Sequence, residues 1–162
     1  MIGDRPLFYR RGPTVTYQMF DSVLIPTDGS EGSEIVVDQG IEVAKRHGAT
    51  VHGLFVVDTR AFLTLESDLQ SETTAHLRDE GERALAELTD TATAAGLDAT
   101  VSIREGSPSD EIVAYVEESD ADLIVMGSHA DYERNMLGSV SSAVVQESPV
   151  SVLTVKFSER DG

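Results

Sequence analysis

The chain has 162 residues and carries 29 Asp plus Glu against 12 Lys plus Arg, a formal net charge of -17. Hydrophobic residues make up 40% of it, and at roughly 150 residues per domain a single packed domain is expected. The negative field excludes binding to the backbone of DNA or RNA and disfavours an anionic membrane surface. Because there is no cysteine, disulfides, thiol catalysis and zinc–thiolate sites are also excluded.

Only two of the basic residues are lysines, Lys45 and Lys156. An excess of acid with scarce lysine is typical of proteins from halophilic organisms, which keep molar salt inside the cell. At that salt concentration the Debye length is about 3 Å, so repulsion between carboxylates is screened. The alternative is an ordinary acidic cytosolic protein. No apolar run approaches the ~20 residues of a membrane span and no signal peptide is recognisable, so we expect a soluble, cytoplasmic protein.

The first 19 residues differ from the rest of the chain. They are rich in Gly, Pro and Arg, carry a charge of +2 and show no sustained periodicity. Met19 directly precedes the first apolar run, so this extension is either an incorrectly assigned translation start or a disordered or docking tail. We expect the folded domain to cover residues 20–157 and a short tail to cover residues 158–162.

From residue 21 onward, short apolar runs alternate with helical patterns. In chain order, we predict strands over 22–26, 50–57, 99–104, 122–126 and 150–156, and helices over 30–47 and 66–95, from 107 or 108, and from 138 or 139. Gly48 and Gly96 end the first two helices, while Ser107 as cap and Pro108 in the first turn begin the third.

Five strands alternating with four helices predict a single doubly wound α/β domain, with a parallel sheet covered by helices on both faces. If the strand order is 3-2-1-4-5, the first and fourth strands flank the switch point, where ligands bind at the carboxyl ends of the strands. Small residues gather at these two places: PTDGS follows the first strand, and MGSHA and LGSVS follow the fourth.

The segments VLIPTDGS, GLFVVD, DLIVMGSH, LGSVSSAVV and SPVSVLTVK together resemble the universal stress protein family, over a span from Phe20 to Lys156. The resemblance implies a Rossmann-like fold of the adenine nucleotide alpha hydrolase type and a regulatory role in stress response. It also implies a homodimer that pairs through its last strand, Val150 to Val155. Apolar β-branched residues on an edge strand fit such pairing.

The resemblance further implies ATP as ligand, with or without Mg²⁺. The adenine and ribose would lie beside the end of the first strand and the main chain of the second. The phosphates would meet the first turn of the last helix, whose N–H groups and dipole favour anions. The implied site residues are Pro26, Thr27, Asp28, Val56, Met126, Gly127, Ser128, His129, Ala130, Gly138, Ser139, Val140 and Ser141.

Two departures from the family's ATP-binding pattern leave an alternative open. That pattern is a glycine, two residues, a glycine, nine residues, and a glycine followed by Ser or Thr. Gly127 and the pair Gly138-Ser139 match it, but Ala130 replaces the second glycine and only seven residues separate Ala130 from Gly138. The alternative function is therefore a protein-interaction module from the branch of the family that does not bind nucleotides.

Other interpretations are weaker. Asp28 can serve as a turn residue only, and Gly138-Ser139 as a helix start only. No catalytic triad or metal-ligand cluster is recoverable, so at most slow ATP hydrolysis is expected. A phosphoryl-accepting receiver would need an aspartate at the end of the third strand, which reads REG, and a nucleotidyl transferase would need more basic residues near the triphosphate than Arg134.

Overall fold

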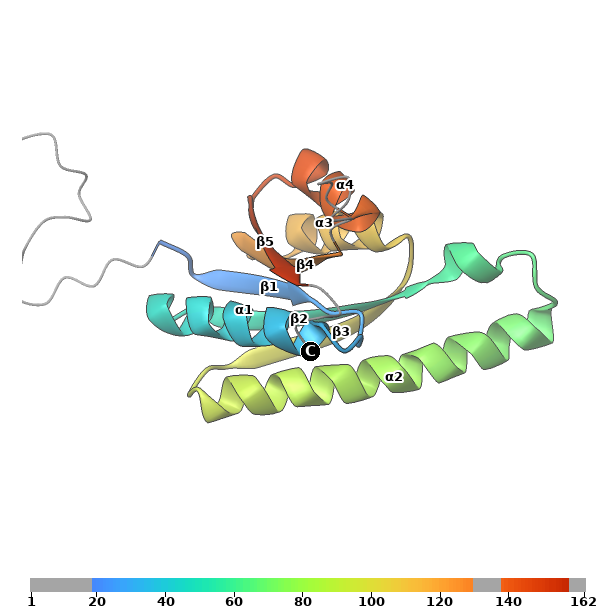
Figure 1. Cartoon of the computed structure of the whole chain (residues 1–162), viewed down its shortest axis with the longest axis horizontal. Helices are drawn as coiled ribbons and strands as arrows, with labels where there is room; N and C mark the ends of the chain where they lie inside the picture. Colours follow the sequence, from blue (N-terminus) through green and yellow to red (C-terminus); the bar gives the residue numbers. More distant parts are fainter. Residues whose placement is uncertain (1–18, 130–137, 158–162) are drawn as a thin grey trace, which may run out of the picture.

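The computed structural model describes residues 19–129 and 138–157. Its elements are β1 (Ser22–Pro26), α1 (Ser33–His47), β2 (Thr50–Asp58), η3 (Thr59–Phe62), α2 (Ser67–Ala94), β3 (Ala99–Gly106), α3 (Pro108–Glu118), β4 (Leu123–His129), α4 (Ser139–Glu147) and β5 (Ser151–Phe157). All strand pairs are parallel and the order is β3-β2-β1-β4-β5. This confirms the predicted doubly wound sheet of order 3-2-1-4-5 (Figure 1).

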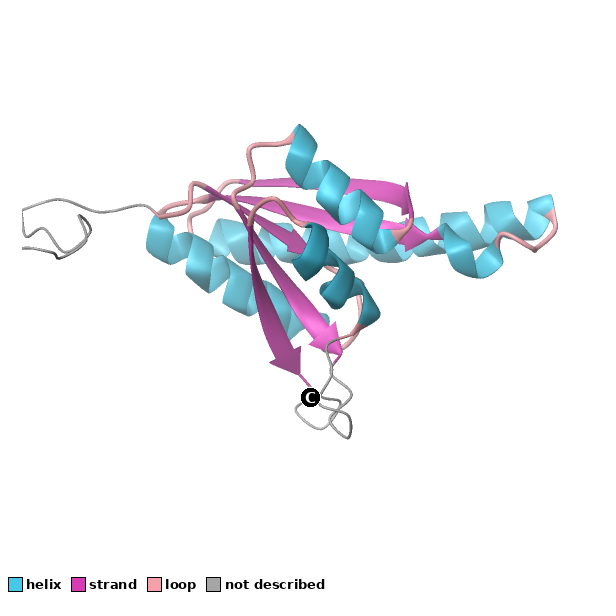
Figure 2. Ribbon diagram, turned by 90° about the horizontal axis from the view of Figure 1, so that it is seen from above, coloured by secondary structure: helices cyan, strands magenta, loops and turns pink. Residues whose placement is uncertain are grey.

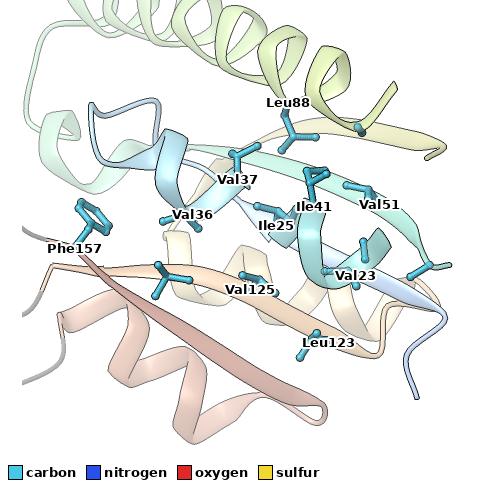
Figure 3. Packing of buried hydrophobic residues seen from close by; sticks show 14 residues of the cluster. Val23, Ile25, Val36, Val37, Ile41, Val51, Leu88, Leu123, Val125 and Phe157 are labelled. Carbon is cyan, nitrogen blue, oxygen red and sulfur yellow. The ribbon is translucent and has the colours of Figure 1, made fainter. Parts of the chain in front are cut away.

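Helices cover the sheet on both faces. In Figure 1, α1 and α2 lie below the sheet, and α3 and α4 lie above it. Side chains in β1 alternate between the two layers: Val23 and Ile25 pack toward α1 and α2, whereas Leu24 packs toward α3 and α4. Figure 3 shows the largest of three clusters of buried residues, in which Val37 of α1 and Leu88 of α2 pack on the same side of the sheet. Each strand of the centre is thus buried on both sides, as a parallel sheet requires.

The helix ends show where local chemistry overrides the sequence pattern. The first helix begins at Ser33 and not at Ser30, because Ser30 belongs to a preceding turn. In that turn, the Ser30 N–H and hydroxyl both donate to Asp28 Oδ1, at 3.0 and 2.6 Å. The predicted stop at Gly48 is confirmed, with a left-handed φ of 62°. Ser107 precedes Pro108 at the start of α3, but its hydroxyl makes no capping hydrogen bond.

The last strand, β5, forms one edge of the sheet. Val155 lies inside the core and is only 4% exposed, so it does not contribute an apolar side chain to the open edge. Val150 and Val152 are partly buried against the core beside α3 and α4. The apolar side chain that β5 leaves open is Leu153, which is 41% exposed.

Within the described residues, no helix combines the length and the apolar character that crossing a membrane requires. The longest helix, α2, has 28 residues, but it carries Asp, Glu and Arg along its length.

The two ends of α2 contribute very differently to stability, and one substitution tests this. Leu88 is fully buried under the sheet, whereas Leu69 is 49% exposed on the same helix. We expect Leu88→Ala to lower the free energy of unfolding by about 2–5 kcal/mol, because it leaves a cavity in the core. The matched control Leu69→Ala should change it by less than about 0.5 kcal/mol. Chemical denaturation in molar KCl measures both, and equal effects would contradict the described packing.

Candidate functional site

The two central strands, β1 and β4, separate early. Their parallel pairing includes only Val23 with Leu123 and Leu24 with Ile124, whereas β1 pairs with β2 as far as Pro26 and Leu54. In Figure 2, the two strands that lead into the grey segments, β4 and β5, fan away from the other strands. The carboxyl ends of β1 and β4 therefore enclose a crevice at the switch point of the sheet, as predicted.

A cavity of about 440 Å³ occupies this crevice, within the size range of small-molecule sites. Its lining residues come from the ends of the strands and the starts of the helices: Pro26, Thr27, Asp28, Ser33, Val36, Leu54, Phe55, Val56, Val57, Asp58, Leu77, Glu80, Pro108, Ile112, Met126, Gly127, Gly138, Ser139, Val140, Ser141 and Phe157. Ten of the thirteen residues that the sequence implied are among them. The other three are Ser128, His129 and Ala130.

The first strand ends in a tight turn at the rim of the cleft. The Thr27 N–H donates to the Leu54 carbonyl at 2.8 Å, and the Thr27 hydroxyl accepts from the N–H of Gly29 at 3.3 Å. Gly29 has a φ of 74°, which favours glycine. Asp28 is exposed at this rim, and its carboxylate accepts the N–H of Ser30. The predicted role of Asp28 as a turn residue is therefore confirmed. The same turn places Asp28 in the lining of the cleft, so the two roles predicted for it are compatible.

Val56 presents its main chain to the cleft. Peptide groups in a strand alternate in direction, so those of Val56 point to the same side as those of Leu54. The Leu54 carbonyl points toward β1, where it accepts the Thr27 N–H. Since the pairing of β1 with β2 ends at Leu54, the N–H and C=O of Val56 face the open cleft. A flat ligand with a donor and an acceptor on one edge can pair with them.

The opposite end of the cleft is the first turn of α4. Gly138 is the N-cap and provides no side-chain cap, so the N–H groups of Ser139, Val140 and Ser141 have no acceptor ahead of them in the described helix. Three open N–H groups and the helix dipole are features that favour an anion at this turn. Ser141 lines the inner wall of the cleft, and at 2% exposure its hydroxyl is buried.

Ser128 lies behind the cleft wall and not in it. It is fully buried, and its hydroxyl accepts the Gly138 N–H and the Ser141 hydroxyl, each at 3.4 Å. Ser128 thus fixes where α4 begins. The main chain of His129 ends β4 opposite Phe157, and its side chain, like all of Ala130, lies outside the described residues.

Phe157 closes the side of the cleft that faces α1, a role the sequence did not indicate. Its ring lies against Gly32 and Gly127, and a Cβ on Gly127 would be 2.6 Å from a ring carbon. The same Cβ would be 2.9 Å from Val36 Cγ2. The ring is 6% exposed. Close packing against Phe157 and Val36 therefore requires glycine at position 127, in addition to any contact with a ligand.

The charge of the cleft is negative. Asp28, Asp58 and Glu80 line it, and no Lys, Arg or His is among the lining residues that the structure describes. Asp58 is held by Arg60 on the rim, with Nε to Oδ1 at 2.9 Å and Nη2 to Oδ2 at 2.8 Å. Glu80 pairs with His76 at 3.2 Å. In the described part of the chain, no group of three acidic or imidazole side chains is arranged to hold a metal ion.

The fold and the cleft define the chain as a doubly wound α/β domain with a cleft at its switch point. A profile of the universal stress protein family matches residues 19–156, most of the chain. The chain therefore belongs to the universal stress protein family, as the sequence motifs indicated.

Individual relatives agree with this assignment. A universal stress protein of Methanocaldococcus jannaschii is 34% identical over 146 residues, which cover 88% of this chain and 86% of the relative. The solved structure of hypothetical protein MJ0577 has a TM-score of 0.75 at 29% identity and covers 87% of this chain and 99% of its own. A universal stress protein solved in complex with cAMP has a TM-score of 0.67 at 27% identity, with coverages of 86% and 99%.

The Asp58–Arg60 pair makes a prediction about pH. The hydrogen bonds from the Arg60 side chain lower the pKa of Asp58, and its backbone N–H adds to this effect, although partial burial opposes it. The pair therefore stabilises the folded chain above the ordinary Asp pKa of about 3.9, and this contribution is lost as the pH falls through the lowered pKa.

Titration of the Asp58 carboxyl by carbon NMR measures this shift. We expect Arg60→Ala to raise the pKa of Asp58 toward its ordinary value, and Arg60→Lys to raise it less because the charge remains. Arg46→Ala, which removes a distant surface partner of Glu42, is the control and should leave Asp58 unchanged. An Asp58 titration that Arg60→Ala does not move would contradict the geometry.

Proposed function

We propose that this universal stress protein is a regulatory module that binds an adenine nucleotide, ATP included, in the cleft between β1 and β4. The observation that carries the proposal is the pairing of two main-chain features across one cavity. The peptide edge of Val56 lies at one end, and the open first turn of α4 lies at the other. The relative solved with cAMP supports a nucleotide as the class of ligand.

Each part of the cleft suits one part of such a ligand. An adenine ring offers a donor and an acceptor on one edge to Val56, while Ile112 and Met126 supply apolar contact. The Asp28 carboxylate lies at the rim, where it can accept a hydrogen bond from a ribose hydroxyl. The first turn of α4 receives phosphate oxygens. Mg²⁺, where it takes part, would be bound mainly by the phosphates and water.

The second candidate is the family branch that does not bind nucleotides, whose partner would be another protein. Three carboxylates in the lining of the cleft favour it, because they repel phosphates. In the sequence, Ala130 and the short segment before Gly138 favour it too, and both lie outside the described residues. Calorimetry separates the two candidates. Heat on titration with ATP and Mg²⁺ in molar KCl supports the nucleotide site, and none at millimolar ATP supports the interaction module.

A single new charge tests the anion end of the cleft. We expect Ser139→Asp to weaken binding of AMP or ATP by about tenfold or more, because it places a carboxylate where phosphate oxygens would meet α4. An acidic residue in a first turn favours the helix, so folding should be preserved.

Ser142→Asp is the matched control, since it adds the same charge to the same helix at a residue that does not line the cleft. In molar KCl, screening over about 3 Å should leave its effect small. Adenosine, which has no phosphate, should bind all three proteins equally. Equal loss of AMP binding in both variants would contradict the assignment of the phosphate end.

We also propose that two chains pair through β5. An uncovered strand edge offers unpaired main-chain groups to another strand, and a two-fold axis lets two copies satisfy each other. On β5 the exposed apolar residue is Leu153, and its neighbour Val152 is partly buried. Continuous pairing of the two edges would cover Leu153 in both copies.

Light scattering during size exclusion in molar KCl tests this pairing. We expect the wild type at twice the chain mass of 17.5 kDa and Leu153→Lys at the chain mass. Val101→Lys is the matched control, because Val101 has the same exposure of 41% on β3, the opposite edge of the sheet. A wild type that stays monomeric at micromolar concentration, or a dimer that only Val101→Lys dissociates, would exclude the β5 interface.

A further inference from the structure

The turn between η3 and α2 projects past the other helices of the domain, as Figures 1 and 2 show. Three leucines on it are exposed, Leu63 at 65%, Leu65 at 40% and Leu69 at 49%. The turn has a defined shape, because the Gln70 side-chain amide donates to the carbonyls of Leu63 and Leu65, at 3.1 and 2.7 Å. We call residues 63–69 the tip. Exposed apolar side chains gathered on one ordered, projecting turn form a surface suited to contact with another segment.

The charges of the tip define what can bind there. Glu66 and Asp68 belong to the tip, and Glu72 lies in the next turn of α2. Within the described part of the chain, none of these three carboxylates pairs with a cation. Arg60, which precedes the tip, is already engaged with Asp58. An occupant that matches the tip therefore combines apolar side chains with positive charge.

The N-terminal segment, residues 1–18, carries this combination in its sequence. Its residues 5–11 read RPLFYRR, in which arginines flank a leucine, a phenylalanine and a tyrosine. The segment has a charge of +2, whereas the whole chain has a net charge of -17. It lies outside the described residues, and neither the fold nor the cleft gives it a role. Its composition is complementary to the tip in both charge and apolar character.

Chain length decides which copy's segment can reach the tip. Asp21 and Asp98 accept hydrogen bonds from adjacent residues of β2, at 3.0 and 2.9 Å, so the start of β1 and the C-terminal end of α2 lie at one edge of the sheet. Helix α2 runs along the strands in Figure 1, and its 28 residues place the tip about 42 Å from that edge. Arg10 is nine residues before Met19, a reach of about 32 Å at full extension. Arg10 and Arg11 are therefore too close to β1 to reach the tip of their own chain.

We propose that the tip of one chain binds the N-terminal segment of a second copy. The apolar side chains of the segment lie against the leucines of the tip, and its arginines lie beside the carboxylates. The proposal depends neither on the ligand of the cleft nor on pairing through β5. Segment and tip are different surfaces, so the contact is heterologous. A short segment buries little area, so the contact is weak and is populated at high protein concentration.

Spin labelling of the full chain in molar KCl, at high protein concentration, tests the proposal. The chain has no cysteine, so Thr64→Cys carries the label at one known place, the tip. This chain is mixed with an unlabelled chain enriched in nitrogen-15, so that only contacts between copies weaken the observed amide signals. We expect the signals of residues 5–11 to lose intensity. Thr93→Cys, also exposed but near the opposite end of α2, is the matched control and should leave them intact.

Three outcomes would overturn the proposal. The first is that residues 5–11 keep their signals with both labels, and the second is that both labels weaken them equally. The third is a loss that occurs only when label and isotope are on the same chain, which would place the segment on its own tip.

A charge on the tip tests the contact surface directly. We expect Leu63→Lys in the spin-labelled chain to abolish the loss of signal, because it removes an exposed apolar side chain and adds a charge that repels arginine. Val145→Lys, at a position 45% exposed on α4, is the matched control and should leave the loss unchanged. Circular dichroism checks that both variants fold. A Leu63→Lys chain that weakens the signals as strongly as the Val145→Lys chain would overturn the proposal.

Discussion

Main-chain pairing holds β1 and β4 together at only two residue pairs, whereas β2 and β3 pair along eight. The site depends on this difference. Past Leu24 and Ile124 the two central strands have no shared hydrogen bonds, so their remaining peptide groups and the loops that follow must find other partners. Thr27 finds one in Leu54, and this contact carries the chain toward β2 and away from β4. The cleft is the space that results, and helices α1 and α4 start at its two sides.

The surface of this chain and its cleft differ in how their negative charges are balanced. Across the chain the net charge of -17 is compatible with folding where salt screens repulsion within about 3 Å. The carboxylates that line the cleft stay partly exposed, 38% for Asp58 and 46% for Glu80, so solvent screens them as well. Arg60 forms an ion pair with Asp58, and His76 approaches Glu80. Asp58 is thus paired with a cation at the rim, while the described residues that line the cleft include no Lys, Arg or His.

Much of this arrangement follows from the sequence, and its limits have physical causes. Buried strands are visible in the sequence as apolar runs, and the strand order places small residues at the switch point. For this reason the sequence predicted that Pro26, Thr27 and the residues of the α4 turn line the crevice, as they do. The start of α1 was placed three residues early because the side chain of Asp28 competes for Ser30, and such local hydrogen bonds are not visible in periodicity.

The residues missed by sequence reasoning reach the cleft through tertiary contacts. Asp58 is the last residue of β2 and of the GLFVVD segment, but the resemblance gave it no role in the site, and Glu80 lies mid-way along a solvated helix. Phe157 is the clearest case, because its partner Gly32 lies 125 positions earlier and only the folded sheet brings the two together. Phe157 and Leu153 also share one face of β5, four residues apart, with the first in the cleft wall and the second on the open edge. One strand therefore contributes both a wall residue of the cleft and the exposed apolar residue at the edge of the sheet.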